Sequence, residues 1–154
     1  WCELVNHCQN MITLTNRNKT MDVDIKLQMP KEPYMLYTDP LRLQQIIINL
    51  LNNALKLTPA GGSITLDYEV DEKKQCMLFS VTDTGTGIPE DKQELVFQRF
   101  EKLNEFVQGT GLGLAICKLT IQYMGGDIWI DKNYKNGARF VFSHPIKKRE
   151  SEEK

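Results

Sequence analysis

The sequence predicts an α+β protein, a two-layer sandwich in which one mixed sheet carries helices on one face. Three observations lead to this prediction. Segments in which apolar and polar residues alternate strictly are separated by segments of helical periodicity. Neighbouring alternating segments are joined by short polar turns, as in hairpins. Strands and helices do not alternate regularly, so a doubly wound parallel sheet fits less well.

The first part of the chain predicts a helix, two strands and a longer helix. Apolar residues recur at helical spacing over residues 1–17 and alternate with polar residues over 23–29. The short apolar run at 34–37 follows two prolines and predicts an edge strand. Asp39 can then cap a helix that begins with a proline and runs over 40–58, where a proline and two glycines stop it.

The second part of the chain predicts two hairpins with helices between them. Alternation over 64–81 is broken by one polar turn, which predicts the first hairpin. A short helix over 91–100 and a longer one over 111–124 follow, and two glycines end the longer one. Residues 127–143 predict the second hairpin. The charged tail at 147–154 has nothing to bury, so we expect it to fray.

Length and charge set limits on the function. The chain has 154 residues, 41% of them hydrophobic, and a formal net charge of -1. One globular domain of this size buries about 70% of its unfolded surface. The balanced charge argues against a broad surface for nucleic acid or anionic lipid, but it permits a pocket for a small anion. No apolar run approaches the roughly 20 residues that span a bilayer, and the first residues do not resemble a signal peptide. We therefore expect a soluble, cytoplasmic domain without direct membrane contact.

The four cysteines do not suggest a metal or redox site. Cys2, Cys8, Cys76 and Cys117 show no C-x-x-C spacing and have no histidine cluster near them in sequence. We interpret them as reduced thiols that behave as small hydrophobic residues.

The helix predicted over 40–58 has two faces of different character. The apolar face, expected to point to the core, consists of Leu43, Ile46, Ile47, Leu50, Leu51, Ala54 and Leu57. A polar line within an arc of roughly 80° consists of Arg42, Gln45, Asn49, Asn53 and Lys56. A line of amides and cations without a carboxylate favours a partner that needs hydrogen bonds and metal ligands. Alternatively, Asn52 and Asn53 are only residues near a fraying helix end.

Two glycine-rich segments could hold an anion. Residues 83–89, Asp-Thr-Gly-Thr-Gly-Ile-Pro, follow a strand directly, and residues 109–114, Gly-Thr-Gly-Leu-Gly-Leu, open a helix. Glycines let backbone N–H groups approach phosphates closely, and a helix N-terminus adds positive partial charge. Neither segment is a Walker A loop or a dinucleotide fingerprint in register. Each alone could be a turn, but the two together with the amide-rich helix predict a phosphate site.

Four segments, in this order, resemble the catalytic ATP-binding domain of bacterial sensor histidine kinases. Residues 49–56 resemble its N box, 83–88 its G1 box, 97–100 (Phe-Gln-Arg-Phe) its F box, and 109–114 its G2 box. The resemblance covers residues 38–145. It implies membership in the superfamily of gyrase, Hsp90, histidine kinases and MutL, whose fold is the two-layer Bergerat sandwich.

The resemblance implies ATP and Mg²⁺ as ligands and gives each polar residue a role. Asp83 would accept a hydrogen bond from the adenine amino group, where guanine presents an acceptor instead, so ATP would be selected over GTP. Asn53 would be the Mg²⁺ ligand, and Asn49, one turn earlier, would support the same site. Lys56 and Lys102 would contact phosphate oxygens.

The remaining implied contacts come from the glycine loops and the F box. They are Gly85, Gly87 and Ile88 in the first loop and Gly109, Thr110, Gly111, Leu112, Gly113 and Leu114 in the second. Phe97 and Phe100 would anchor the base of a lid through apolar packing. Residues 101–108 correspond to the mobile ATP lid of the family, which we expect to become ordered only over nucleotide.

The chain departs from the family pattern in three respects. Leu57 stands where an aromatic residue usually follows the N-box lysine, which removes a ring contact with the nucleotide. Ala138 stands where a hydroxyl residue is common. No phosphoacceptor sequence is present, because neither the acidic residue and Arg nor the Thr-Pro typical after an acceptor follows His7. His144 precedes a proline at the end of a strand, where we expect a structural role.

The resemblance also implies a domain organisation and a reaction. Residues 1–20 would be the end of a helical linker from a dimerisation and phosphoacceptor domain, 21–146 the catalytic domain, and 147–154 a polar tail. The catalytic domain would transfer the γ-phosphoryl group of ATP to a histidine on that dimerisation domain of the same protein. Relay to a response-regulator receiver domain would follow. The parent protein could itself be membrane-anchored.

Two other functions stay open. ATP hydrolases of the superfamily carry a glutamate one turn before the metal-binding asparagine to activate water. Here that position is Asn49, and an amide does not accept a proton near neutral pH, which favours a kinase over a hydrolase. A regulatory module that binds nucleotide without phosphotransfer would contain the same binding residues, so only a phosphotransfer assay separates it from a kinase.

Overall fold

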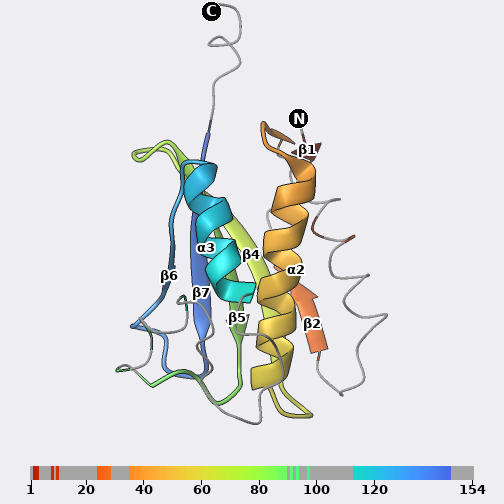
Figure 1. Ribbon diagram of the computed structural model, residues 1–154. Coiled ribbons are helices and arrows are strands. Elements are labelled where there is room, and N and C mark those ends of the chain that lie inside the picture. The colour runs from red at the N-terminus through yellow and green to blue at the C-terminus, as the bar shows by residue number, and fades with distance from the viewer. Residues whose placement is uncertain are drawn as a thin grey trace, which may run out of the picture.

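One mixed sheet covered by helices on a single face forms the fold, as the sequence predicts (Figure 1). The computed structural model describes residues 2–3, 8, 10, 24–28, 35–89, 91, 93, 97 and 113–146. Within them, the sheet consists of β2 (Asp24–Leu27), β4 (Ser63–Asp71), β5 (Cys76–Asp83), β6 (Ile128–Ile130) and β7 (Arg139–Pro145). Helices α2 (Pro40–Leu57) and α3 (Gly113–Tyr123) pack on it.

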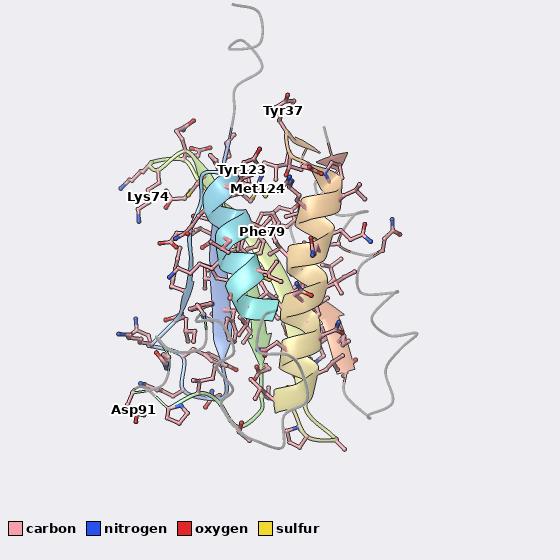
Figure 2. The ribbon with its side chains drawn as sticks, viewed as in Figure 1. Tyr37, Lys74, Phe79, Asp91, Tyr123 and Met124 are labelled. Atoms are coloured by element: carbon pink, nitrogen blue, oxygen red, sulfur yellow. The ribbon has the colours of Figure 1, made fainter. Side chains whose placement is uncertain are left out.

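Strand order explains why the sheet is mixed. The order is β2-β4-β5-β7-β6, with β2 parallel to β4 and every other neighbouring pair antiparallel. The two predicted hairpins are confirmed as β4–β5 and β6–β7. Burial alternates along β5 and β7, so one face of each strand packs under the helices. Phe79 on β5 stacks on Phe142 on β7, with ring centroids 4.7 Å apart, and lies between the helices and the sheet (Figure 2).

Helix α2 begins and ends where the sequence predicts. Its N-cap Asp39 accepts hydrogen bonds from the backbone N–H groups of Leu41 (3.1 Å) and Arg42 (3.3 Å). At the other end, the Thr58 hydroxyl donates to the Ala54 carbonyl (2.7 Å). The whole predicted apolar stripe is buried, and burying each large aliphatic side chain contributes about 1.5–3 kcal/mol. This stripe fixes which side of α2 remains for the polar line.

Helix α3 lies beside α2 on the same face of the sheet (Figure 1). Cys117 and Ile121 point into the core, and Gly125, with a φ of +95°, follows the helix as a left-handed residue. Cys8 is also buried, so both thiols behave as the small hydrophobic residues that we expected. No helix in the described ranges is both long and apolar enough to cross a bilayer.

The chain start differs in part from the prediction. Residues 2–3, expected to be helical, form β1 (Cys2–Glu3), which pairs antiparallel with β3 (Met35–Leu36) in a separate two-stranded sheet. Cys8 and Asn10 are helical. Pairing with a strand more than thirty residues later overrides the local helical periodicity at residues 2–3. The strand predicted at 34–37 is confirmed, but it pairs with β1 and not with the main sheet.

His144 has the structural surroundings expected for it. The ring is buried near the end of β7, with Nε2 2.9 Å from the Thr38 hydroxyl and Nδ1 2.8 Å from the Pro145 carbonyl oxygen. It therefore connects β7 to the segment that leads into α2. Of the short helix predicted over 91–100, the structure describes Asp91 and Phe97, both in 3₁₀ geometry, and a turn at Gln93. The tail at 147–154 lies outside the described residues.

Candidate nucleotide-binding site

Asp83 is the last residue of β5, and its side chain is fully buried. Its Oδ1 accepts two backbone hydrogen bonds, from the N–H groups of Gly85 (2.9 Å) and Ala138 (3.1 Å). Its Oδ2 is buried and has no hydrogen-bond partner in the described part of the chain. One oxygen is thus fixed in direction, and the other is an acceptor that needs a donor from elsewhere.

Burial also sets the charge preference of this carboxyl group. Loss of hydration raises the pKa of Asp83 above its ordinary value of 3.8, and the hydrogen bonds from Gly85 and Ala138 oppose part of that rise. A buried carboxylate oxygen without a partner destabilises the fold. Groups of this kind, with perturbed pKa values, concentrate at functional sites.

The glycine loop after β5 lies against the end of the amide-rich helix. The Thr86 N–H donates to the Leu57 carbonyl (3.2 Å), and a Cβ atom on Gly85 would lie 2.1 Å from that same carbonyl oxygen. Gly87 has a φ of +72°, a conformation that glycine adopts readily. Gly85 is therefore required by the close approach of the loop to α2, and Gly87 is favoured by its backbone conformation. Ile88, the next residue, is buried.

The turn between β6 and β7 reaches Asp83 from the other side. The Asp83 N–H donates to the Ala138 carbonyl (2.9 Å), while the Tyr134 hydroxyl donates to the Asp83 carbonyl (3.1 Å). Gly137 approaches so closely that a Cβ atom there would lie 2.1 Å from the Asp83 carbonyl oxygen. The turn itself is predictable from the sequence, but the parts that Tyr134, Gly137 and the Ala138 backbone play in the site are not. The missing information was the β5–β7 register, which sequence periodicity does not provide.

Gly137→Ala should show how much this close approach matters. We expect a loss of about 2–4 kcal/mol of unfolding free energy, because the new methyl group meets the Asp83 backbone and the φ of +149° is unfavourable for alanine. Urea unfolding measures it. Gly61→Ala is the matched control, since Gly61 has a φ of +88° but no atom within 4 Å of an added Cβ. That control should lose only about 1 kcal/mol. Equal losses would contradict the tight contact at Gly137.

The polar line on α2 is partly used in packing against α3. The Arg42 guanidinium lies 4.7 Å from the centre of the Tyr123 ring. Asn49 is half-buried and hydrogen-bonds with the Cys117 thiol. Burial raises the pKa of Cys117, and the bond with Asn49 opposes part of this rise, so that the pKa is about 11. The Arg42 side chain therefore covers an aromatic ring of α3.

Asn53 is a further member of this line. Its side chain is half-buried, and its Nδ2 atom has no hydrogen-bond partner in the described ranges. A carboxamide can turn to present either its oxygen or its nitrogen, and amide oxygens suit Mg²⁺. The described residues contain no group of three His, Cys, Asp or Glu side chains that could hold a metal ion. A magnesium ion bound here would be held by the Asn53 amide oxygen, phosphate oxygens and water.

A cleft of about 250 Å³ adjoins Asp83. Its walls come from the glycine loop, the segment after it and the β6–β7 turn, and they are formed by Thr86, Gly87, Ile88, Pro89, Gln93, Ile130, Asp131, Tyr134, Lys135, Gly137 and Ala138. Gln93, which belongs to none of the sequence motifs, donates from Nε2 to the Ile88 carbonyl (3.1 Å). Its Oε1 is a second buried acceptor without a partner among the described residues. The cleft is thus more polar than apolar, with hydrogen-bond acceptors left unused in and beside it.

The structure leaves several predicted site residues undescribed. Phe97 is described and packs edge-to-face on Phe140, with ring centroids 6.0 Å apart. Gly113 and Leu114 begin α3, and Leu114 packs against the core. The residues outside the described ranges are His7, Phe100, Lys102, Gly109, Thr110, Gly111, Leu112 and the lid segment 101–108, and the Lys56 side chain is likewise not described. Their roles, and those of the described residues toward a nucleotide, stay predictions.

Comparison with protein families agrees with this geometry. Residues 38–148 match the model of the histidine kinase-, DNA gyrase B-, and HSP90-like ATPase family. The chain belongs to this family. The matched range contains α2, both hairpins and α3, and therefore every described residue of the site.

Relatives of this ATPase family domain are sensory kinases by name. It is 38% identical to the adaptive-response sensory kinase SasA of Nostoc sp. over 135 residues, 86% of this chain and 33% of that protein. It is 32% identical to the sensor histidine kinase WalK of Bacillus subtilis over 157 residues, 99% of this chain and 26% of that protein. The chain thus spans about a third or less of the length of these curated relatives.

Solved structures share the fold. The catalytic domain of histidine kinase ThkA has a TM-score of 0.82 and 31% identity, covering 94% of this chain and 93% of that one. Full-length ShkA in complex with AMPPNP has a TM-score of 0.76 and 30% identity, over 91% of this chain and 29% of that one. ThkA in complex with the response regulator protein TrrA has a TM-score of 0.79 and 28% identity, over 95% of this chain and 41% of that one.

Proposed function

We propose that this domain is the ATP-binding catalytic domain of a two-component sensor histidine kinase. It binds ATP with Mg²⁺ and transfers the γ-phosphoryl group to a histidine on a dimerisation domain of the same protein, from which a response-regulator receiver domain receives it. The observation that carries the proposal is Asp83, a buried carboxylate with one oxygen fixed by backbone and the other unpartnered beside a glycine loop. The kinase relatives support the reaction.

Asp83 would recognise the base. Its unpartnered Oδ2 is an acceptor, and the 6-amino group of adenine is a donor. Guanine presents a carbonyl oxygen at the same place, so it would leave two acceptors facing each other. A site built to bond one polar group discriminates strongly against the analogue that lacks it. The preference for ATP over GTP thus rests on one carboxylate oxygen.

The phosphate end would be held by a metal and by backbone N–H groups. Mg²⁺, when bound, neutralises phosphate charge, and the Asn53 amide oxygen would hold it with water and phosphate oxygens. Asn49 would support Asn53 from one turn earlier on α2. Lys56 and Lys102 would add mobile positive charge, and the glycines of 109–113 would supply N–H donors to the β- and γ-phosphates.

A kinase fits this site better than a hydrolase. Asn49 is an amide and cannot take a proton from water near neutral pH. Its neighbour cannot either, because burial raises the pKa of the Cys117 thiol to about 11 and keeps it protonated. An imidazole acceptor is already nucleophilic at neutral pH, so its phosphorylation needs positioning and charge stabilisation more than a strong base.

The domain organisation and location follow the same proposal. Residues 1–20 would lead from the phosphoacceptor domain, residues 21–146 would form the catalytic domain, and 147–154 would be a polar tail. The solved complex of ThkA with the response regulator TrrA supports a receiver domain as partner. We place the domain in the cytoplasm, with no nucleic acid and no direct membrane contact among its partners.

Labelled phosphotransfer tests the proposal. The chain is incubated with γ-labelled Mg·ATP and the dimerisation domain of the same protein, and calorimetry compares Mg·ATP with Mg·GTP. We expect label on a histidine of the dimerisation domain and at least about tenfold tighter binding of ATP. Release of free phosphate without a labelled histidine would instead indicate a hydrolase. Tight ATP binding with neither product would indicate a regulatory module.

A further inference from the structure

The β6–β7 turn supplies a hydrogen bond that the base-recognising aspartate would otherwise lack. The β5–β7 ladder ends at the pair Thr82↔Arg139, so the carbonyl oxygen of the next residue, Asp83, has no partner in that ladder. The Tyr134 hydroxyl donates to it at 3.1 Å. Tyr134 is half-buried and also lines the cleft beside Asp83.

Arg139 holds the Tyr134 ring in place. Its guanidinium carbon lies 4.6 Å from the centre of the ring, an attractive cation–π arrangement. The same guanidinium is itself fixed, because Nε donates to the Thr82 hydroxyl (3.1 Å) and Nη1 donates to Asp131 Oδ2 (3.4 Å). The ion pair is partly exposed and adds little stability by itself. Its effect is geometric, since it fixes the plane on which Tyr134 rests.

Three parts of Asp83 are bound by one short segment, residues 134–138. The Asp83 N–H donates to Ala138, Oδ1 accepts from Ala138, and the carbonyl oxygen accepts from Tyr134. Of these, only the Tyr134 bond uses a side chain of that segment, so it depends on the residue type at position 134. Without it, the peptide group that follows Asp83 keeps the bond from the Thr84 N–H to the Ser63 carbonyl (3.1 Å) but loses the bond that holds its carbonyl oxygen to the β6–β7 turn. The direction of the carboxylate can then shift. A hydrogen bond to a base depends on the position and direction of the acceptor oxygen, and shifts of less than about 1 Å weaken it.

We propose that Tyr134 is a positioning residue for adenine recognition: with Arg139 behind its ring, it fixes the Asp83 main chain so that Oδ2 meets the 6-amino group. The inference rests on the proposed function, because it assumes that Asp83 reads the base. It adds a specificity determinant that lies outside all four of the sequence motifs. Its signature is a loss of selectivity for the amino group, which a general loss of stability does not produce.

Tyr134→Phe with two nucleotides tests the inference. Calorimetry compares Mg·ATP with the Mg²⁺ complex of purine riboside triphosphate, which is ATP without the 6-amino group. In the variant we expect ATP to bind about three- to fivefold more weakly, in line with one hydrogen bond, and the analogue to bind as in the wild type. Equal losses for both nucleotides, or no loss for either, would overturn the inference. A wild-type chain that binds both equally would overturn base recognition by Asp83 as well.

Three further variants separate positioning from packing. Tyr123→Phe removes a hydroxyl from a tyrosine that is 77% exposed and lies at the opposite end of the molecule from Asp91 (Figure 2), and it should change neither affinity. Arg139→Gln should lower the ATP-to-analogue ratio in the same direction. If Arg139 acts through the Tyr134 ring, the double variant loses no more selectivity than Tyr134→Phe alone. Fully additive losses would show that Arg139 acts by another route and would overturn that part of the inference.

Discussion

Asp83→Asn is expected to weaken ATP binding about 10- to 100-fold without unfolding the domain. A hydrogen bond to a charged group is worth about 1.5–3 kcal/mol, and each 1.4 kcal/mol is about tenfold in affinity. The asparagine Oδ1 still accepts the N–H groups of Gly85 and Ala138, so the loop keeps its support. At the other position, an NH₂ group replaces Oδ2 and meets the adenine amino group donor to donor. Calorimetry with Mg·ATP measures the loss.

Asp83→Asn should weaken ATP binding but raise the stability of the fold. Because burial raises the pKa of Asp83, the folded chain binds its proton more readily than the unfolded chain, whose value is near 3.8. The ionised Asp83 carboxylate therefore lowers the free energy of unfolding at pH values above its folded-state pKa. This loss of stability becomes smaller as the pH falls toward 3.8. Asn carries no charge at any pH, so the variant should be the more stable protein at pH 8, by a margin that shrinks on acidification. Urea unfolding at pH 8 and pH 5 checks the sign.

Controls can separate this effect from a general effect of removing a carboxylate. Asp67 lies on the uncovered face of β4, and burial also raises its pKa. Asp67→Asn should leave ATP binding unchanged.

In the Asp83 variant the preference for ATP over GTP should narrow, because the new NH₂ group can donate to the guanine carbonyl. Acidification should weaken ATP binding to the wild type, since protonation turns the acceptor into a donor. Equal losses for ATP and GTP would contradict the base assignment.

The long elements could be predicted because their signals are local. Each signal depends on residues that are close together in the sequence. Examples are the cap at Asp39, the apolar stripe of α2 and the alternation along β4 and β5, all of which the structure confirms. The strand at residues 2–3 could not be predicted in this way. Its partner lies at residues 35–36, and two residues are too few for their own periodicity to decide between helix and strand.

The site could be predicted only on one side. Motif residues such as Asp83 and the glycines after it are recognisable in the sequence. The groups that orient Asp83 come from residues 51 and 55 positions later, Tyr134 and Ala138, and only the strand register brings them there. Leu57 illustrates a related limit. Its side chain suggested a lost ring contact, whereas its backbone carbonyl accepts from Thr86 and connects α2 to the loop, which any residue type could do.

Asn53→Ala is the second variant with a large expected effect. It should lower magnesium-dependent phosphotransfer by at least about 100-fold, because even second-shell changes at metal sites cost about 10- to 100-fold. It should also remove the effect of Mg²⁺ on binding, so that the variant binds ATP in Mg²⁺ as weakly as the wild type does in a chelator. Calorimetry with and without chelator, together with the labelled phosphotransfer assay, measures both effects.

The stability of the same variant distinguishes a ligand-binding asparagine from a structural one. Alanine removes a buried amide nitrogen that has no partner in the described structure, and it raises helix propensity by up to about 0.7 kcal/mol. The variant should therefore unfold at equal or higher urea concentration. Asn52→Ala makes the same exchange one position earlier, where the side chain is exposed, and it should keep full activity. If Asn53→Ala is destabilised, or if Mg²⁺ strengthens its ATP binding as in the wild type, Asn53 supports the helix and the metal is held by other groups.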